Sequence, residues 1–108
     1  MATLNIIQVR CIDRQDRVGP DKFSVYIDGR KHAGEFTIGA DETLLLNTAY
    51  EFQGRADVEL WEEDSGTGND DKLGGFWAEE GEIGDGELEK SFSFARRGDY
   101  NMWYEVKA

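Results

Sequence analysis

Apolar and polar residues alternate along most of the chain, which is the period expected of strands with one face in a core. Gly, Asp and Asn residues interrupt the alternation at short intervals and favour turns. No stretch has the spacing of an amphipathic helix. The pattern predicts eight strands, near residues 3–12, 22–28, 32–38, 43–52, 56–60, 73–79, 88–95 and 100–106.

Local signals add detail to these strands. The apolar positions change phase at Ile6 and Ile7, which suits either a bulge in the first strand or burial of that strand on both faces. Asp28-Gly29 predicts a tight hairpin, because a type I′ turn needs a positive φ at both central residues. The segment 79–89 is acidic and rich in glycine, and we expect a solvated loop there. Eight strands at this spacing imply an all-β sandwich of two antiparallel sheets.

Composition and charge narrow the classes of protein. The chain has 108 residues, which suits one domain over 1–108, and its 39% apolar content can form one packed core. The formal charge of -11 repels phosphate backbones, so nucleic acid is excluded as a partner. Such a charge serves solubility, or it is balanced by a bound metal ion.

The acidic residues gather in two predicted loops. If consecutive strands run antiparallel, the loops after the first and fifth strands emerge at the same pole of the sandwich. We therefore expect the carboxylates of both loops to lie close together. The residues are Asp13, Asp16 and Asp21 in the first loop, and Glu62, Glu63, Asp64, Asp70 and Asp71 in the second.

Calcium explains such a cluster better than other metals do. Two carboxylates about 5 Å apart repel by about 3 kcal/mol at an effective dielectric near 20, and a cation reverses that sign. Calcium takes six to eight oxygen ligands, whereas zinc, copper and iron prefer nitrogen or sulfur ligands that one His and one Cys cannot supply. An EF-hand loop starting at Asp64 is rejected, because Asn69 and Gly75 stand where Gly and Glu are required. The alternative is that these acids are solvated turn residues.

The two acidic loops resemble those of C2 domains, which are calcium-dependent β-sandwiches that often bring proteins to phospholipid. The first match is Asp16-Arg-Val-Gly19-Pro-Asp21-Lys-Phe23, and the second is Glu62-Glu63-Asp64 with Asp71-Lys72-Leu73-Gly74. The resemblance implies a C2-like Greek-key sandwich with Asp16, Asp21, Glu62, Asp64 and Asp71 as bridging carboxylates. It also implies a ligand from the backbone carbonyl of Glu63, with Asp13 and Asp70 as further candidates.

Other residue types point away from catalysis. His32 has no Ser or Cys nucleophile near it in the sequence, and Cys11 lies in an apolar strand, so we expect no enzyme. Trp61 and Trp103 lie opposite the inward residues of their strands, and Trp77 lies beside Gly74-Gly75-Phe76. Exposed Trp side chains can stack on sugars or fill an interface, but we expect the twisted sheets to cover each ring.

These observations predict a calcium-binding module whose two loops control attachment to a partner. One alternative is a structural or assembly protein built from the sandwich, and a second is a carbohydrate-binding module. Membrane binding is expected to be weak or absent, because the loop tips carry few apolar or basic residues. No conventional signal peptide or membrane-spanning run is present, so we expect a cytoplasmic protein or one exported without a leader.

Overall fold

The computed structural model describes residues 1–13, 21–63, 71–94 and 97–108, almost all of them in strands. The described elements are β1 (Ala2–Asp13), β2 (Asp21–Ile27), β3 (Arg30–Ile38), β4 (Thr43–Phe52), β5 (Arg55–Glu62), β6 (Asp71–Glu79), the 3-10 turn η1 (Glu80–Glu82), β7 (Leu88–Phe94) and β8 (Arg97–Lys107). No helix among these residues has the length and apolar content needed to cross a membrane.

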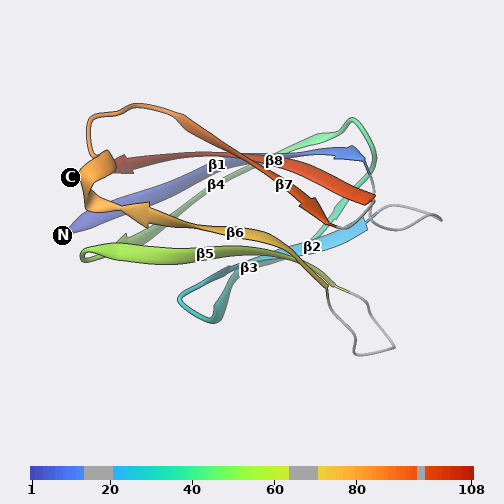
Figure 1. Ribbon diagram of the computed structural model, residues 1–108, viewed down its shortest axis with the longest axis horizontal. Coiled ribbons are helices and arrows are strands. Elements are labelled where there is room, and N and C mark those ends of the chain that lie inside the picture. Colours follow the sequence, from blue (N-terminus) through green and yellow to red (C-terminus); the bar gives the residue numbers. More distant parts are fainter. Residues whose placement is uncertain (14–20, 64–70, 95–96) are drawn as a thin grey trace.

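The strands form two sheets that pack face to face (Figure 1). One sheet has the order β4-β1-β8-β7 and the other has the order β3-β2-β5-β6, with antiparallel pairing throughout. The prediction of an all-β, eight-stranded antiparallel sandwich is confirmed. The chain changes sheet several times, so that β1 and β2, which are consecutive, lie in different layers.

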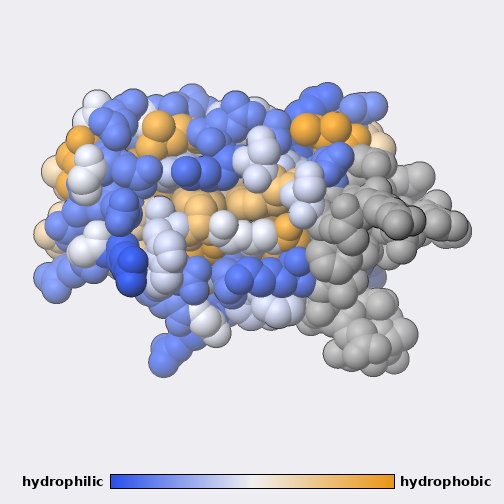
Figure 2. Space-filling view, viewed as in Figure 1, coloured by the Kyte–Doolittle hydropathy of each residue, from blue (hydrophilic) through white to orange (hydrophobic). Residues whose placement is uncertain are grey.

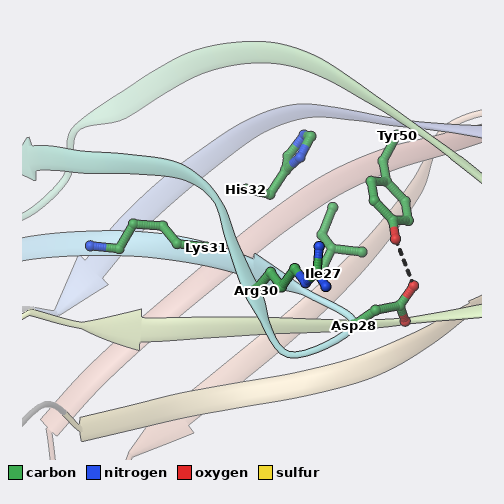
Figure 3. Close-up of a pocket in the computed structure, with 6 residues that line it drawn as sticks. All are labelled: Ile27, Asp28, Arg30, Lys31, His32 and Tyr50. Carbon is green, nitrogen blue, oxygen red and sulfur yellow. Dashed lines mark hydrogen bonds between the residues drawn. The ribbon is translucent and has the colours of Figure 1, made fainter.

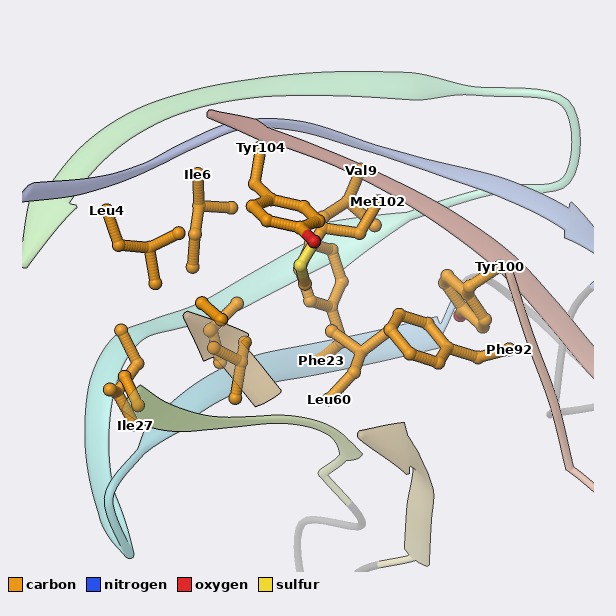
Figure 4. Packing of buried hydrophobic residues seen from close by; sticks show 14 of the residues in the cluster. Leu4, Ile6, Val9, Phe23, Ile27, Leu60, Phe92, Tyr100, Met102 and Tyr104 are labelled. Atoms are coloured by element: carbon orange, nitrogen blue, oxygen red, sulfur yellow. The ribbon is translucent and has the colours of Figure 1, made fainter. Parts of the chain in front are cut away.

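The core lies between the two sheets and is built from alternate residues of the strands (Figure 4). In β8, the four predicted inward residues are all buried, namely Tyr100, Met102, Tyr104 and Val106. In β5, the same holds for Ala56, Val58 and Leu60. Burial of these apolar side chains is the main stabilising contribution to the sandwich.

Two local predictions are confirmed by the backbone. The pairing of β1 with both neighbours shifts between Ile6 and Gln8, so the bulge is the alternative that explains the change of apolar phase. Asp28 has φ 52° and Gly29 has φ 83°, so both central residues of the hairpin are left-handed as a type I′ turn requires.

The segment 79–89 is largely exposed, as expected of a solvated loop, but it also contains a short 3-10 turn. Strand β6 extends to Glu79, η1 follows directly, and β7 begins at Leu88. The side chain of Glu82 ties the turn to the sandwich, because its Oε2 accepts a hydrogen bond of 2.8 Å from the buried Tyr104 hydroxyl. A single 3-10 turn is too short to leave a period in the sequence, so the alternation could not predict it.

The face of the molecule seen in Figure 2 is mostly polar in its described part. Figure 2 shows hydrophilic residues over most of one face, with a strip of apolar residues along its middle, between the two sheets. The expectation that every Trp is covered is wrong for Trp77, which is 48% exposed and carries the Arg55 guanidinium 4.1 Å from its ring centroid. Trp61 and Trp103 are half-buried.

Candidate metal centre

The ends of several strands meet at one pole, as the antiparallel argument predicts. Strand β1 ends at Asp13, β2 begins at Asp21, β5 ends at Glu62 and β6 begins at Asp71. Glu62 pairs with Asp71 across β5 and β6, and Asp13 pairs with Asp99 of β8. The described strand ends on either side of both acidic segments therefore lie at this pole, which we call the acidic pole.

Asp21 and Glu62 come closest to forming a site. Asp21 lies two residues before Phe23, whose backbone partner on β5 is Glu62, so the two acids are diagonal neighbours on adjacent strands. Diagonal neighbours on one face have Cβ atoms about 7–8 Å apart, which two carboxylates can span around one ion. Both side chains are buried, with exposed fractions of 0% and 2%.

A tyrosine from the opposite sheet holds Asp21. The Tyr100 hydroxyl donates a hydrogen bond to Asp21 Oδ2, and both residues are fully buried. Burial, reinforced by this hydrogen bond to a carboxylate, raises the pKa of the Tyr100 phenol far above its ordinary value. The phenol therefore stays protonated and remains a hydrogen-bond donor to Asp21 at physiological pH.

Glu63 directs its side chain to the outer face of the sandwich. Its Oε1 lies 3.1 Å from Lys31 Nζ and accepts a 3.5 Å hydrogen bond from the Tyr26 hydroxyl. Its backbone N–H donates to the Lys22 carbonyl at 2.7 Å. With the carboxylate held in this way, the predicted ligand role of Glu63 rests on its backbone carbonyl.

The full ligand set stays a prediction. Asp16, Asp64 and Asp70 lie in segments 14–20 and 64–70, outside the described residues, and only the backbones of Asp13 and Asp71 are described. Among the side chains that the structure does describe, no three or more of the His, Cys, Asp and Glu groups gather closely enough to hold a metal ion. The donors at the described strand ends are oxygen atoms of buried carboxylates, and this chemistry fits calcium.

Sequence reasoning missed two features of the acidic pole. The turn after β3 carries Asp41 and Glu42 and reaches this pole, because Ile38 at the end of β3 pairs with Asp21. The antiparallel argument would have found this turn, since it too follows an odd-numbered strand. The role of Tyr100 left no such signal, because its place in the alternation marks it only as a core residue.

A separate hollow of about 290 Å³ lies where the β2–β3 hairpin meets β4 (Figure 3). It is lined by Ile27, Asp28, Arg30, Lys31, His32 and Tyr50. Figure 3 shows the Tyr50 hydroxyl bonded to Asp28, at 2.8 Å, with Lys31 directed away from that pair. His32 Nε2 lies 2.9 Å from Thr48 Oγ1, and burial lowers the pKa of its imidazole. The hairpin places this hollow at the end of β2 opposite Asp21.

Comparisons of sequence give no match, either to a protein-family model or to a curated protein. Comparisons of structure, in contrast, give several matches. Human GIVD cytosolic phospholipase A2 matches 98% of the chain with a TM-score of 0.60 and 20% identity, although the chain spans only 16% of that protein. A structure described as a C2 domain matches 99% of the chain, with a TM-score of 0.51 and 19% identity over 97% of its own length.

A structure of the C2A and C2B domains of Extended-Synaptotagmin 2 matches 97% of the chain, with a TM-score of 0.54 and 16% identity over 40% of that two-domain chain. At identities this low, a structural match shows only that the strands are arranged alike. The function has to be argued from the residues of the site. The two sheets, their strand order and these structural matches together show that the chain is a C2-like β-sandwich.

Proposed function

We propose that this protein is a non-enzymatic calcium-binding module, in which the two acidic segments of the acidic pole coordinate Ca²⁺ and control attachment to a partner. The observation that carries the proposal is the pair Asp21 and Glu62. These acids flank different loops, yet they lie buried on adjacent strands and on the same face. Buried carboxylates at neighbouring strand ends are costly unless a cation or strong hydrogen bonds stabilise them.

Each predicted ligand has a defined part. Asp21 and Glu62 supply carboxylates from the rigid ends of β2 and β5, and Glu63 supplies its carbonyl. Asp16, Asp64 and Asp71 supply further carboxylates, with Asp13 and Asp70 as additional candidates. A structure of Extended-Synaptotagmin 2 that also matches this chain is described as calcium bound, which supports the choice of ion.

The ion acts as a switch through charge. Without it, the carboxylates of the two segments repel one another, and the chain as a whole carries a formal charge of -11. Bound Ca²⁺ neutralises part of that charge and holds both segments in one arrangement. A protein partner or a second copy of the chain then meets an ordered surface in place of a repulsive one. The identity of the partner gives the attachment its selectivity, and calcium binding controls when the partner attaches.

The experiment is a calorimetric titration of chelator-treated protein with CaCl₂, using wild type, Asp21→Asn, Glu62→Gln and Asp85→Asn. Asp85 lies in the connection between η1 and β7, at the end of β6 away from the acidic pole, so its variant controls for a lost charge. We expect saturable binding in wild type and Asp85→Asn. Binding should weaken at least about tenfold in the other two, because each loses an anionic ligand. Equal affinities in all four proteins would place the ion elsewhere, and no heat in any of them would reject calcium binding.

A further inference from the structure

A second candidate binding site lies on the outer face of the sheet β3-β2-β5-β6, where a pocket of about 200 Å³ is lined by Tyr26, Gly29, Glu59 and Trp61. Tyr26 lies between the buried Val25 and Ile27, and Glu59 and Trp61 flank the buried Leu60. Alternate residues of a strand point to opposite faces, so these side chains point away from the core. The pocket is therefore a feature of the surface.

Two aromatic rings form the walls of the pocket. The ring centroids of Tyr26 and Trp61 are 5.9 Å apart and the ring planes are inclined by 57°. Both side chains are half-buried, so each keeps some surface open to solvent. A ligand that enters this corner meets two apolar ring surfaces.

Charged groups around the rings are held in fixed positions. Glu59 Oε1 accepts a 3.2 Å hydrogen bond from Trp61 Nε1, and Glu59 Oε2 lies 2.7 Å from Lys72 Nζ. On the other side, Glu63 accepts from the Tyr26 hydroxyl and pairs with Lys31. Each ring is thus linked to a glutamate that is paired with a lysine. Such networks fix donors and acceptors before a ligand arrives.

The charged groups around the pocket indicate which class of ligand it suits. Glu59 is paired with Lys72 and Glu63 with Lys31, so each charged group that contacts the two rings already has a partner of opposite sign. The ammonium of Lys31 already lies 5.9 Å from the Tyr26 ring centroid, where a ligand cation would otherwise sit. A neutral ligand with one apolar face and several hydroxyl groups matches both the rings and the fixed polar atoms.

We propose that this pocket binds a single neutral pyranose ring of a saccharide. The C–H face of the sugar packs against the aromatic corner, its hydroxyl groups donate to Glu59, and Lys72 donates to a hydroxyl oxygen. The volume of about 200 Å³ is below the usual range for larger organic ligands and suits one ring or the end of a chain. This activity goes beyond the proposed calcium function and does not depend on it.

The test is an NMR titration that follows the three Trp indole N–H signals in one spectrum. The probes are methyl β-glucopyranoside, methyl β-galactopyranoside, methyl α-mannopyranoside and N-acetylglucosamine, each added up to about 50 mM, since contacts to one sugar ring suggest a millimolar Kd. The measurements are made in CaCl₂ and in chelator. We expect at least one sugar to shift the Trp61 signal saturably under both conditions. The signals of Trp77 and Trp103 should stay in place, because both residues lie outside the pocket.

Variants separate specific binding from general effects. Tyr26→Ala and Glu59→Ala should raise the Kd at least about tenfold, whereas Trp77→Ala, which removes an exposed ring on the same strand as Lys72, should leave it within about twofold. No saturable shift with any of the four sugars overturns the proposal, as do equal shifts of all three indoles. A Trp61 response to tetramethylammonium chloride alone would also overturn it, by showing that the pocket takes a cation.

Discussion

Tyr100 reaches across the sandwich and donates a hydrogen bond from its phenol to Oδ2 of Asp21, the first residue of β2. Tyr100 lies on β8 of one sheet and Asp21 lies in the other, so this bond joins the two layers at the acidic pole. It fixes one carboxylate oxygen and hence the direction of the other. In the proposed calcium site, Tyr100 is therefore a positioning residue for a ligand.

Replacing Tyr100 by Phe should weaken calcium binding about tenfold or more, which is the usual cost of losing a partner of a metal ligand. The matched control is Tyr104→Phe. Tyr104 lies on the same strand, is equally buried and also donates to a carboxylate, that of Glu82, but far from the acidic pole. Both variants should lose about 1 kcal/mol or more of folding free energy. Calorimetry and thermal melts should thus show a shared loss of stability and an affinity change in Tyr100→Phe alone.

Gly74 is required by its neighbour. A Cβ on Gly74 would overlap the ring of Phe92, which faces it from β7 across the core. Gly74→Ala should therefore lower the free energy of unfolding by about 1–3 kcal/mol, as overpacking of a core does. Gly81→Ala is the control, since a Cβ there meets nothing within 4 Å, and it should change stability by less than about 0.5 kcal/mol. Urea denaturation of both variants measures the difference, and equal midpoints would contradict this account.

Asp28 stabilises the β2–β3 hairpin through both of its oxygen atoms. Oδ2 accepts from the Tyr50 hydroxyl at 2.8 Å, and Oδ1 accepts from the Asp57 N–H at 2.9 Å. Asp28→Ala loses both bonds and places a less suitable residue at a positive φ, which should cost about 2–3 kcal/mol. Asp28→Asn keeps an acceptor and tolerates that backbone, so it should cost less than half as much. Chemical denaturation of the two variants compares these costs.

His32 should make stability depend on pH. Burial lowers the pKa of its imidazole in the folded state below the ordinary value near 6.5. The unfolded chain then binds the proton more readily, so the contribution of His32 is complete above about pH 6.5 and declines as the pH falls towards the folded pKa. His32→Gln removes this dependence. Between about pH 7.5 and 5.5, the melting temperature of wild type should fall about 1–3 °C more than that of the variant, a small effect because the ring is only half-buried. Parallel curves would contradict it.

Much of the fold could be predicted because it depends on local patterns. The alternation through β8 marks Tyr100 and Tyr104 as inward residues whatever their partners are. Asp28-Gly29 specifies a hairpin because the backbone itself demands a positive φ at both residues. The phase change at Ile6 indicates an irregularity in the strand, and the pairing of β1 then shows that it is a bulge and not burial on both faces.

The candidate sites could be predicted only in outline, because they depend on which strands are neighbours. Antiparallel order alone brings the loops of Asp21 and Glu62 to one pole. That β2 pairs with β5, which makes these two acids diagonal neighbours, is a long-range choice that alternation does not encode. The same pairing places Tyr26 beside Trp61 and creates the aromatic pocket. The sequence could only mark Trp61 as lying opposite the inward face.

The account is tested most directly by titrating ¹⁵N-labelled, chelator-treated protein with CaCl₂ and following the backbone amide signals. Calcium at the acidic pole should shift the amides of Asp21, Glu62 and Glu63 saturably, and should leave those of Gly54 and Glu82, at the opposite strand ends, unchanged. Signals that stay in place at millimolar calcium, or shifts that are largest at Gly54 and Glu82, would contradict a calcium site formed by Asp21 and Glu62.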